Sequence, residues 1–133
     1  MSPRRSLSAC LILAIIFSGA VTPLFQPSVV VAALPDTPSN VSPSDNATDV
    51  SLMPTLEASP YYDSDNDTHV ASDWQISTMK GNYAGHLVWD SGRDTANLVM
   101  IDIPSGQLSY STTYWWRVQY EDNTTVWSDW SAE

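Results

Sequence analysis

Residues 108–121 read LSYSTTYWWRVQYE, an aromatic-rich stretch with a period of two. One set of alternate positions is mostly apolar: Leu108, Tyr110, Thr112, Tyr114, Trp116, Val118 and Tyr120. The other set ends in polar residues after Trp115: Arg117, Gln119 and Glu121. Because successive side chains of a β-strand point to opposite faces, this period predicts a strand over residues 110–121 with one face toward a core. We place four of these side chains in that core: Leu108, Tyr114, Trp116 and Val118.

A second alternating run, residues 70–79, predicts a strand that buries Trp74 and Ile76 between two sheets. Further short apolar stretches occur at residues 55–59, 86–89 and 96–103, and none shows helical spacing. Turn residues separate the stretches, at 60–68, 80–82, 90–94 and 104–106. Short strands at this spacing predict an all-β, immunoglobulin-like sandwich.

Two of these segments also resemble a known family. The run from Leu108 to Val118 resembles the signature around the sixth strand of fibronectin type III modules. Residues 127–131, WSDWS, resemble the Trp-Ser-x-Trp-Ser box of cytokine-receptor fibronectin modules. The stretch from Pro35 onward resembles domains of large prokaryotic surface proteins. The resemblance implies a fibronectin type III-like domain over residues 51–133.

The carboxyl end is short for such a module. Only two residues follow Ser131, whereas a fibronectin module has a seventh strand after the Trp-Ser box. We therefore expect the sandwich to lack its last strand, which would leave an edge with unpaired backbone groups. Two explanations stay open: truncation of a longer surface protein, or completion of the domain by a strand from another chain.

The amino end has the pattern of a secretory signal peptide. Arg4 and Arg5 precede an apolar run over residues 7–21, and small residues at 31–33 offer a cleavage site. The run is shorter than the roughly 20 apolar residues of a membrane span, so an uncleaved anchor is the weaker alternative. We expect a signal peptide over 1–33, then a Pro- and Ser-rich linker with a first edge strand over 34–50. A secreted or cell-surface location follows, with no transmembrane segment after cleavage.

Composition excludes several classes of function. The 133 residues include 15 acidic and 5 basic ones, a net charge of -10, which argues against nucleic acid as a partner. Cys10 lies inside the apolar run, so the exported part has no cysteine for thiol catalysis, zinc or disulfides. No nucleophile elbow is present, and we expect the protein not to be an enzyme.

An acidic loop is the candidate cofactor site. Asp63, Asp65 and Asp67 occupy alternate positions, and Asp73 follows. Carboxylate oxygens at this spacing suit Ca²⁺, although Thr68 stands where an EF-hand has glycine. The sequence leaves two interpretations: a calcium site formed by these four residues, or a solvated acidic turn. No other cofactor is indicated.

Aromatic residues gather around one cation. Arg117 and Trp115 share the polar face of their strand, and Trp127 and Trp130 return past it after a turn. A guanidinium between indole rings gains ~0.5–2 kcal/mol per contact, so these four residues predict a structural ladder. The alternative is an exposed tryptophan platform that stacks sugar rings.

These expectations describe a non-enzymatic, exported structural or adhesion module that spaces or displays domains of a cell-surface protein. Its partners would be proteins or neighbouring domains of a longer chain. Two other functions stay open: a carbohydrate-binding module that uses exposed tryptophan to bind glycan, and a calcium-stiffened adhesion repeat.

Overall fold

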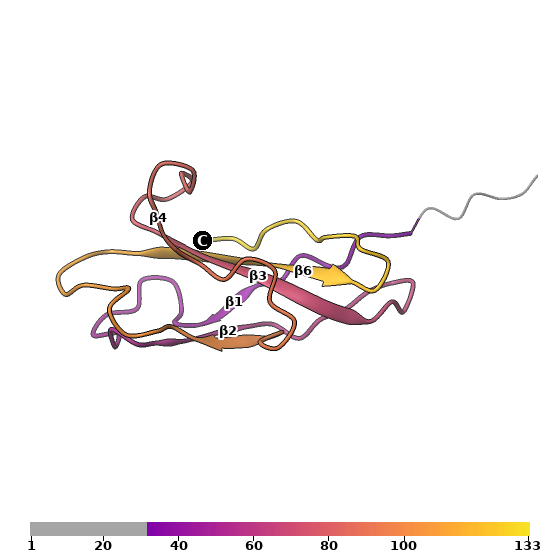
Figure 1. Ribbon diagram of the computed structural model, residues 1–133, viewed down its shortest axis with the longest axis horizontal. Coiled ribbons are helices and arrows are strands. Elements are labelled where there is room, and N and C mark those ends of the chain that lie inside the picture. Colours follow the sequence, from indigo (N-terminus) through magenta and orange to yellow (C-terminus); the bar gives the residue numbers. More distant parts are fainter. Residues whose placement is uncertain (1–31) are drawn as a thin grey trace, which may run out of the picture.

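The computed structural model describes residues 32–133, which form two stacked three-stranded antiparallel sheets (Figure 1). One sheet has the order β1-β2-β5, with β1 (Asn40–Ser42), β2 (Thr55–Ala58) and β5 (Met100–Asp102). The other has the order β4-β3-β6, with β3 (His69–Ser77), β4 (Leu87–Asp90) and β6 (Trp115–Asp122). The predicted all-β sandwich is confirmed. Nothing in residues 32–133 forms an apolar helix of membrane-spanning length.

The predicted signal peptide, residues 1–33, falls almost wholly outside the described residues. The predicted linker is described, and it packs on the domain through buried Pro35 and Pro38. It contains β1, which lies at the edge of its sheet and pairs with β2.

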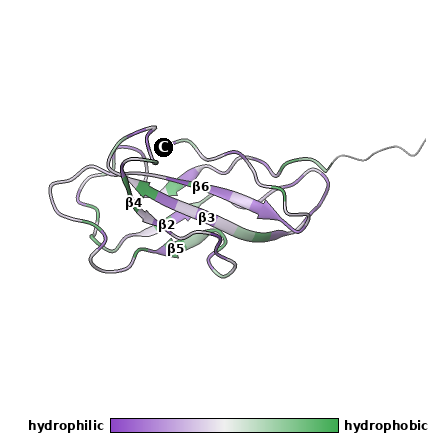
Figure 2. Cartoon of the chain, turned by 45° about the horizontal axis from the view of Figure 1, so that its top comes forward, coloured by the Kyte–Doolittle hydropathy of each residue, from purple (hydrophilic) through white to green (hydrophobic). Residues whose placement is uncertain are grey.

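The pairing of β3 with β6 forms the centre of the sandwich. Burial alternates along the middle of both strands, over residues 72–76 and 117–120. Figure 2 shows hydrophobic and hydrophilic residues following one another along β3. Trp74 lies opposite Val118 in the register, and both side chains are fully buried. The facing sheet contributes Leu56 from β2 and Ile101 from β5 to the same cluster. The core therefore lies between the two sheets, where the alternating faces meet.

The remaining predicted core residues surround this centre. Ile76 is buried within the cluster, whereas Leu108, Tyr114 and Trp116 are partly buried against it. The rings of Trp74 and Trp116 stack with their centroids 6.0 Å apart.

The last strand begins later than the sequence pattern predicts. β6 starts at Trp115, and Tyr110 is 82% exposed in the preceding loop. Ser111 has a φ of 55°, a left-handed conformation that ends the extended alternation before it reaches Tyr110. The Tyr114 hydroxyl accepts a hydrogen bond from the Ser109 backbone at 2.9 Å, which holds the loop folded back on itself.

The expectation of an open edge on β6 is wrong. No named strand follows β6 in the described chain, but residues 126–131 run back along it (Figure 1). Backbone N–H groups of Ser128 and Ser131 donate to the carbonyls of Tyr120 and Val118 at 2.8 and 2.9 Å. The hydroxyls of the same serines accept from the N–H groups of Tyr120 and Val118, both at 3.0 Å. Because serine side chains replace missing backbone acceptors, an irregular segment pairs this edge.

Candidate functional site

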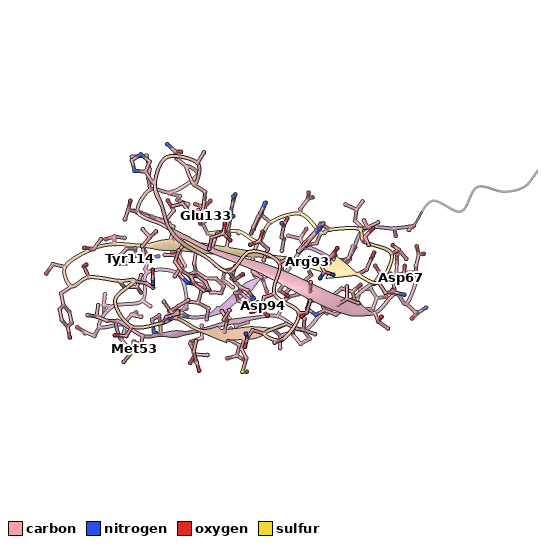
Figure 3. All side chains as sticks on the ribbon, in the orientation of Figure 1. Met53, Asp67, Arg93, Asp94, Tyr114 and Glu133 are labelled. Carbon is pink, nitrogen blue, oxygen red and sulfur yellow. The ribbon has the colours of Figure 1, made fainter. Side chains whose placement is uncertain are left out.

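The predicted acidic loop brings three of its carboxylates together. One oxygen each from Asp63, Asp65 and Asp67 lies within 4.8 Å of the other two. The Asp63 side chain accepts a hydrogen bond from the Asp65 backbone at 2.7 Å, and Asn66 adopts a left-handed φ of 62°. This local turn folds alternate residues of the loop onto one side. In Figure 3, Asp67 lies at the end of the sandwich where β6 finishes.

A fourth carboxylate, Asp122, lies beside this loop. It pairs with His69 in the β3–β6 register, and the next residue, Asn123, exchanges two hydrogen bonds with Thr68 at 2.9 and 3.0 Å. Oδ1 of Asp122 accepts three hydrogen bonds, two from Thr124 and one from Val126, between 2.7 and 2.9 Å. Oδ2 is buried without a partner among the described residues. The sequence analysis missed Asp122 because only strand pairing brings it to the loop.

The electrostatics of this group are unfavourable. Burial, and then the charges of Asp122, Asp63 and Asp65, raise the pKa of Asp67. Burial and the charges of Asp63, Asp122 and Asp67 raise the pKa of Tyr61 to about 12. No ion pair reaches these carboxylates from within residues 32–133, where the pair that forms is Arg93–Glu121. Burial favours a higher pKa for Asp122, but hydrogen bonds from Val126 and Thr124 lower it. The three loop carboxylates, in contrast, repel each other with no cationic side chain of residues 32–133 paired to them.

The fourth predicted ligand, Asp73, does not belong to this group. It lies in β3 four residues beyond His69, about 13 Å along an extended strand. Its side chain accepts a long hydrogen bond of 3.4 Å from Gln119. Burial and the nearby charge of Asp90 raise the pKa of Asp73 to about 6, although Gln119 and Arg117 oppose the shift.

Arg117 occupies a closed cation–π site. Its Cζ lies 3.8 Å from the ring centroid of Tyr83 and 4.1 Å from that of Trp130. Nε and Nη2 both donate to Oε1 of Gln75, at 3.0 and 2.8 Å. Tyr83 comes from the loop between β3 and β4, and burial raises the pKa of its hydroxyl. Two rings and one amide thus surround the guanidinium.

This arrangement corrects the predicted ladder. Tyr83 takes the place expected for Trp127, because Trp127 bridges to Glu121, four residues along β6 from Arg117 and therefore about 13 Å away. Trp115 is half-buried opposite Ser77, and the cation–π contacts of Arg117 do not include it. No sequence signal identifies Tyr83, since a folded loop places it there.

None of the tryptophans forms an exposed platform. All six lie within the described residues, and each is buried or half-buried. The most exposed aromatic side chains are tyrosines, Tyr110 and Tyr62. A flat indole surface for sugar stacking is therefore not a feature of this part of the chain.

One histidine contacts a serine in the described structure. Nε2 of His69 lies 2.9 Å from Oγ of Ser72, a distance at which a base could activate a hydroxyl. Ser72 is fully buried, however, and the His69 ring is stacked on Tyr61 with centroids 4.6 Å apart. A substrate cannot reach this hydroxyl, so the pair is a packing contact.

A hollow of about 960 Å³ opens between the sheets at the opposite end. It is lined by Asn40 and Leu56 on one side and by Leu108 and Trp116 on the other. Nδ2 of Asn40 donates to the carbonyl of Trp116 at 2.8 Å, which bridges the two sides. The hollow lies far from the acidic loop, at the end marked by Tyr114 (Figure 3).

Comparison with known families identifies the fold independently. Residues 55–133 match the family described as the Rha78A-like, N-terminal immunoglobulin domain. The chain belongs to this family. Membership in the Rha78A-like family confirms the immunoglobulin-like part of the predicted resemblance and agrees with the two-sheet architecture. Comparisons with curated proteins and with solved structures give no match.

Proposed function

We propose that this chain is an exported, non-enzymatic module that spaces or displays neighbouring domains of a longer secreted or cell-surface protein. The family description places such domains at the amino end of their proteins, which fits a module that precedes other domains. The apolar run over residues 7–21 supports export. Immunoglobulin-like domains generally serve as scaffolds, and their functions depend on sites added to them.

The observation that carries this proposal is that Arg117 makes its contacts within the domain itself. Its guanidinium lies over the rings of both Tyr83 and Trp130, and its Nε and Nη2 donate to Gln75. Trp130 belongs to the segment that covers β6, so the stack fastens that segment to the sheet. The most distinctive side chains of the domain therefore stabilise the domain itself, which supports rigid presentation as its mechanism.

Export and spacing can be tested together. Residues 1–133 are fused to a reporter enzyme that becomes active only after export, and the fusion is compared with Leu13→Arg, which breaks the apolar run. We expect the unmodified fusion to be active, Leu13→Arg to be inactive and the matched control Ser51→Arg to be active. Spin labels at Leu34 and Ala132, with Cys10 replaced by serine, should then give one narrow distance. Activity in Leu13→Arg, or a broad distance distribution, would contradict the proposal.

We further propose that the domain is of the fibronectin type III kind, with residues 127–131 acting as a Trp-Ser box. The contact of Trp130 with Arg117 and the serine bonds to β6 support this assignment. Exchange of residues 127–131 for the box of a cytokine-receptor module should preserve stability. A chain that unfolds after this exchange would argue against the assignment.

A panel of saccharides tests the competing carbohydrate-binding function, which the half-buried tryptophans do not favour. We expect tryptophan fluorescence to stay unchanged across the panel. Saturable quenching by one sugar would replace the spacer with a sugar-binding module.

A further inference from the structure

The carboxylates at the β6 end of the sandwich are placed to share a divalent cation. We propose that Asp63, Asp65 and Asp67 form a calcium site in the loop before β3, and that Asp122, at the end of β6 beside this loop, completes the coordination when the ion binds. This inference goes beyond the proposed spacer function and does not depend on it. Three independent features carry it: the spacing of the oxygens, the buried oxygens without partners, and the uncompensated charge.

The oxygen spacing matches the size of a calcium ion. Oxygens of Asp63, Asp65 and Asp67 lie within 4.8 Å of one another. Calcium takes six to eight oxygens at about 2.3–2.6 Å, so two oxygens on the same ion are separated by at most about 5 Å. Magnesium requires a more regular octahedron at about 2.0–2.1 Å and releases its water reluctantly. A flexible loop with several carboxylates therefore favours calcium.

Two buried oxygens are left without hydrogen-bond partners. Oδ2 of Asp63 and Oδ2 of Asp122 are both buried and unpaired in the described structure, and the residues are only 5% and 0% exposed. A carboxylate oxygen that is buried without a hydrogen-bond partner destabilises the folded state. The three bonds to Oδ1 fix the Asp122 carboxylate, so its Oδ2 cannot rotate toward another donor. A cation would satisfy both oxygens at once.

Asp122 is independent of the acidic loop, which strengthens the inference. It is the last residue of β6, whereas the other three residues precede β3, and the two segments are joined by the Thr68–Asn123 hydrogen bonds. Asp122 lies opposite His69 in the β3–β6 register, and Asp67 is only two residues before His69, which places Asp122 beside the loop. The site is thus assembled by tertiary structure and would be absent from the unfolded chain.

Calcium would also fasten the start of the domain. In the uncleaved chain, the backbone N–H of Ala33 donates to Oδ2 of Asp65 at 2.6 Å, so this proposed ligand contacts the segment that ends at the predicted cleavage site. An ion held by Asp65 and Asp122 would connect this segment, the acidic loop and the turn after β6. Because the ion would bind only the folded state, it would raise the melting temperature with its concentration.

The test measures calcium binding and thermal unfolding of the full 133-residue chain. Calorimetric titration should show one calcium per chain, with a dissociation constant of about 10⁻⁴–10⁻³ M, the range of extracellular calcium modules. The melting temperature should be higher in calcium than in chelator, and magnesium should give a much smaller rise. Asp67→Asn and Asp122→Asn should each weaken binding at least tenfold.

The control is Asp45→Asn, which removes the same charge from an exposed loop elsewhere and should bind like the unmodified chain. In chelator, Asp67→Asn should melt above the unmodified chain because it relieves repulsion, whereas in calcium it should melt below. If Asp122→Asn fails to fold, the calcium affinity of Asp67→Asn, at a half-buried position, decides the test. The proposal is overturned if calcium gives neither heat nor a shift, if magnesium acts equally, or if Asp45→Asn loses as much affinity as Asp67→Asn.

Discussion

Ser131 and Val118 exchange two hydrogen bonds across the edge of β6. The Ser131 N–H donates to the Val118 carbonyl at 2.9 Å, and the Ser131 hydroxyl accepts from the Val118 N–H at 3.0 Å. Ser128 and Tyr120 repeat the same pair of bonds. At both positions the serine hydroxyl accepts the hydrogen bond that a backbone carbonyl would accept in a regular strand. An irregular segment thus pairs the edge of β6.

Loss of either hydroxyl should destabilise the domain. Ser131→Ala leaves the N–H of Val118 unpaired in a buried position, which costs about 1–3 kcal/mol of the free energy of unfolding. We expect urea unfolding to show this loss for Ser131→Ala and Ser128→Ala, with faster hydrogen exchange at the Val118 and Tyr120 amides. The exposed Ser105→Ala serves as control and should change stability by less than about 0.5 kcal/mol. Unchanged exchange at both amides would show that the hydroxyls are dispensable.

Arg117→Ala should lower stability by about 2 kcal/mol, because it removes two cation–π contacts and two hydrogen bonds to Gln75. Arg117→Lys should recover only part of this loss, since an ammonium lacks the planar face that stacks between rings. Chemical unfolding measures both variants, with exposed Lys80→Ala as control. Equal stability of Arg117→Lys and the unmodified chain would mean that charge alone matters.

Asp73 should make stability depend on pH in a defined direction. Its folded pKa of about 6 lies above the ordinary 3.8, so between these values the folded state binds more protons than the unfolded state. The contribution of Asp73 to the free energy of unfolding is thus retained below pH 3.8 and lost as pH rises through about 6. Asp73→Asn should flatten this part of the profile, measured by urea unfolding from pH 4 to 7.

Asp90→Asn should flatten the same profile in part, because Asp90 contributes to the raised pKa of Asp73. Asp49→Asn, in an exposed loop, is the matched control and should keep the slope of the unmodified chain. The expectation fails if Asp73→Asn and Asp49→Asn give superimposable profiles.

Tyr120→Phe should cost about 1 kcal/mol, the usual value for one net hydrogen bond. The Tyr120 hydroxyl donates to the Ser59 carbonyl at 2.6 Å, which connects the two sheets at a buried position. Tyr110→Phe is the control. Because Tyr110 is 82% exposed, removal of its hydroxyl should leave the melting temperature unchanged. If Tyr120→Phe and Tyr110→Phe have the same melting temperature, the hydrogen bond to Ser59 adds nothing to stability.

Alternation of side chains was sufficient to predict the central strands of the sandwich. The runs around Trp74 and Val118 predicted β3 and β6, because burial of one face imposes a period of two on the sequence. The same period could not predict where β6 begins. The left-handed conformation of Ser111 interrupts the extended chain, although the sequence alternation continues to Tyr110.

The residues around the acidic loop and around Arg117 were harder to predict from the sequence. Three carboxylates of one loop could be recognised from their spacing, since a local turn brings them together. Asp122 and Tyr83 could not, because β-pairing and loop packing bring them to their partners from distant positions. Asp73 was wrongly added to the cluster for the opposite reason: it is close in sequence but separated by extended strand.

The order in which the chain is made gives the serine-bonded segment a consequence for maturation. Residues 126–131 emerge after the six strands of the described chain, so the edge of β6 stays unpaired until they arrive. Exposed flanks of this kind recruit foreign chains and start aggregates. The nascent polypeptide therefore needs protection from such contacts until residues 126–131 have been synthesised.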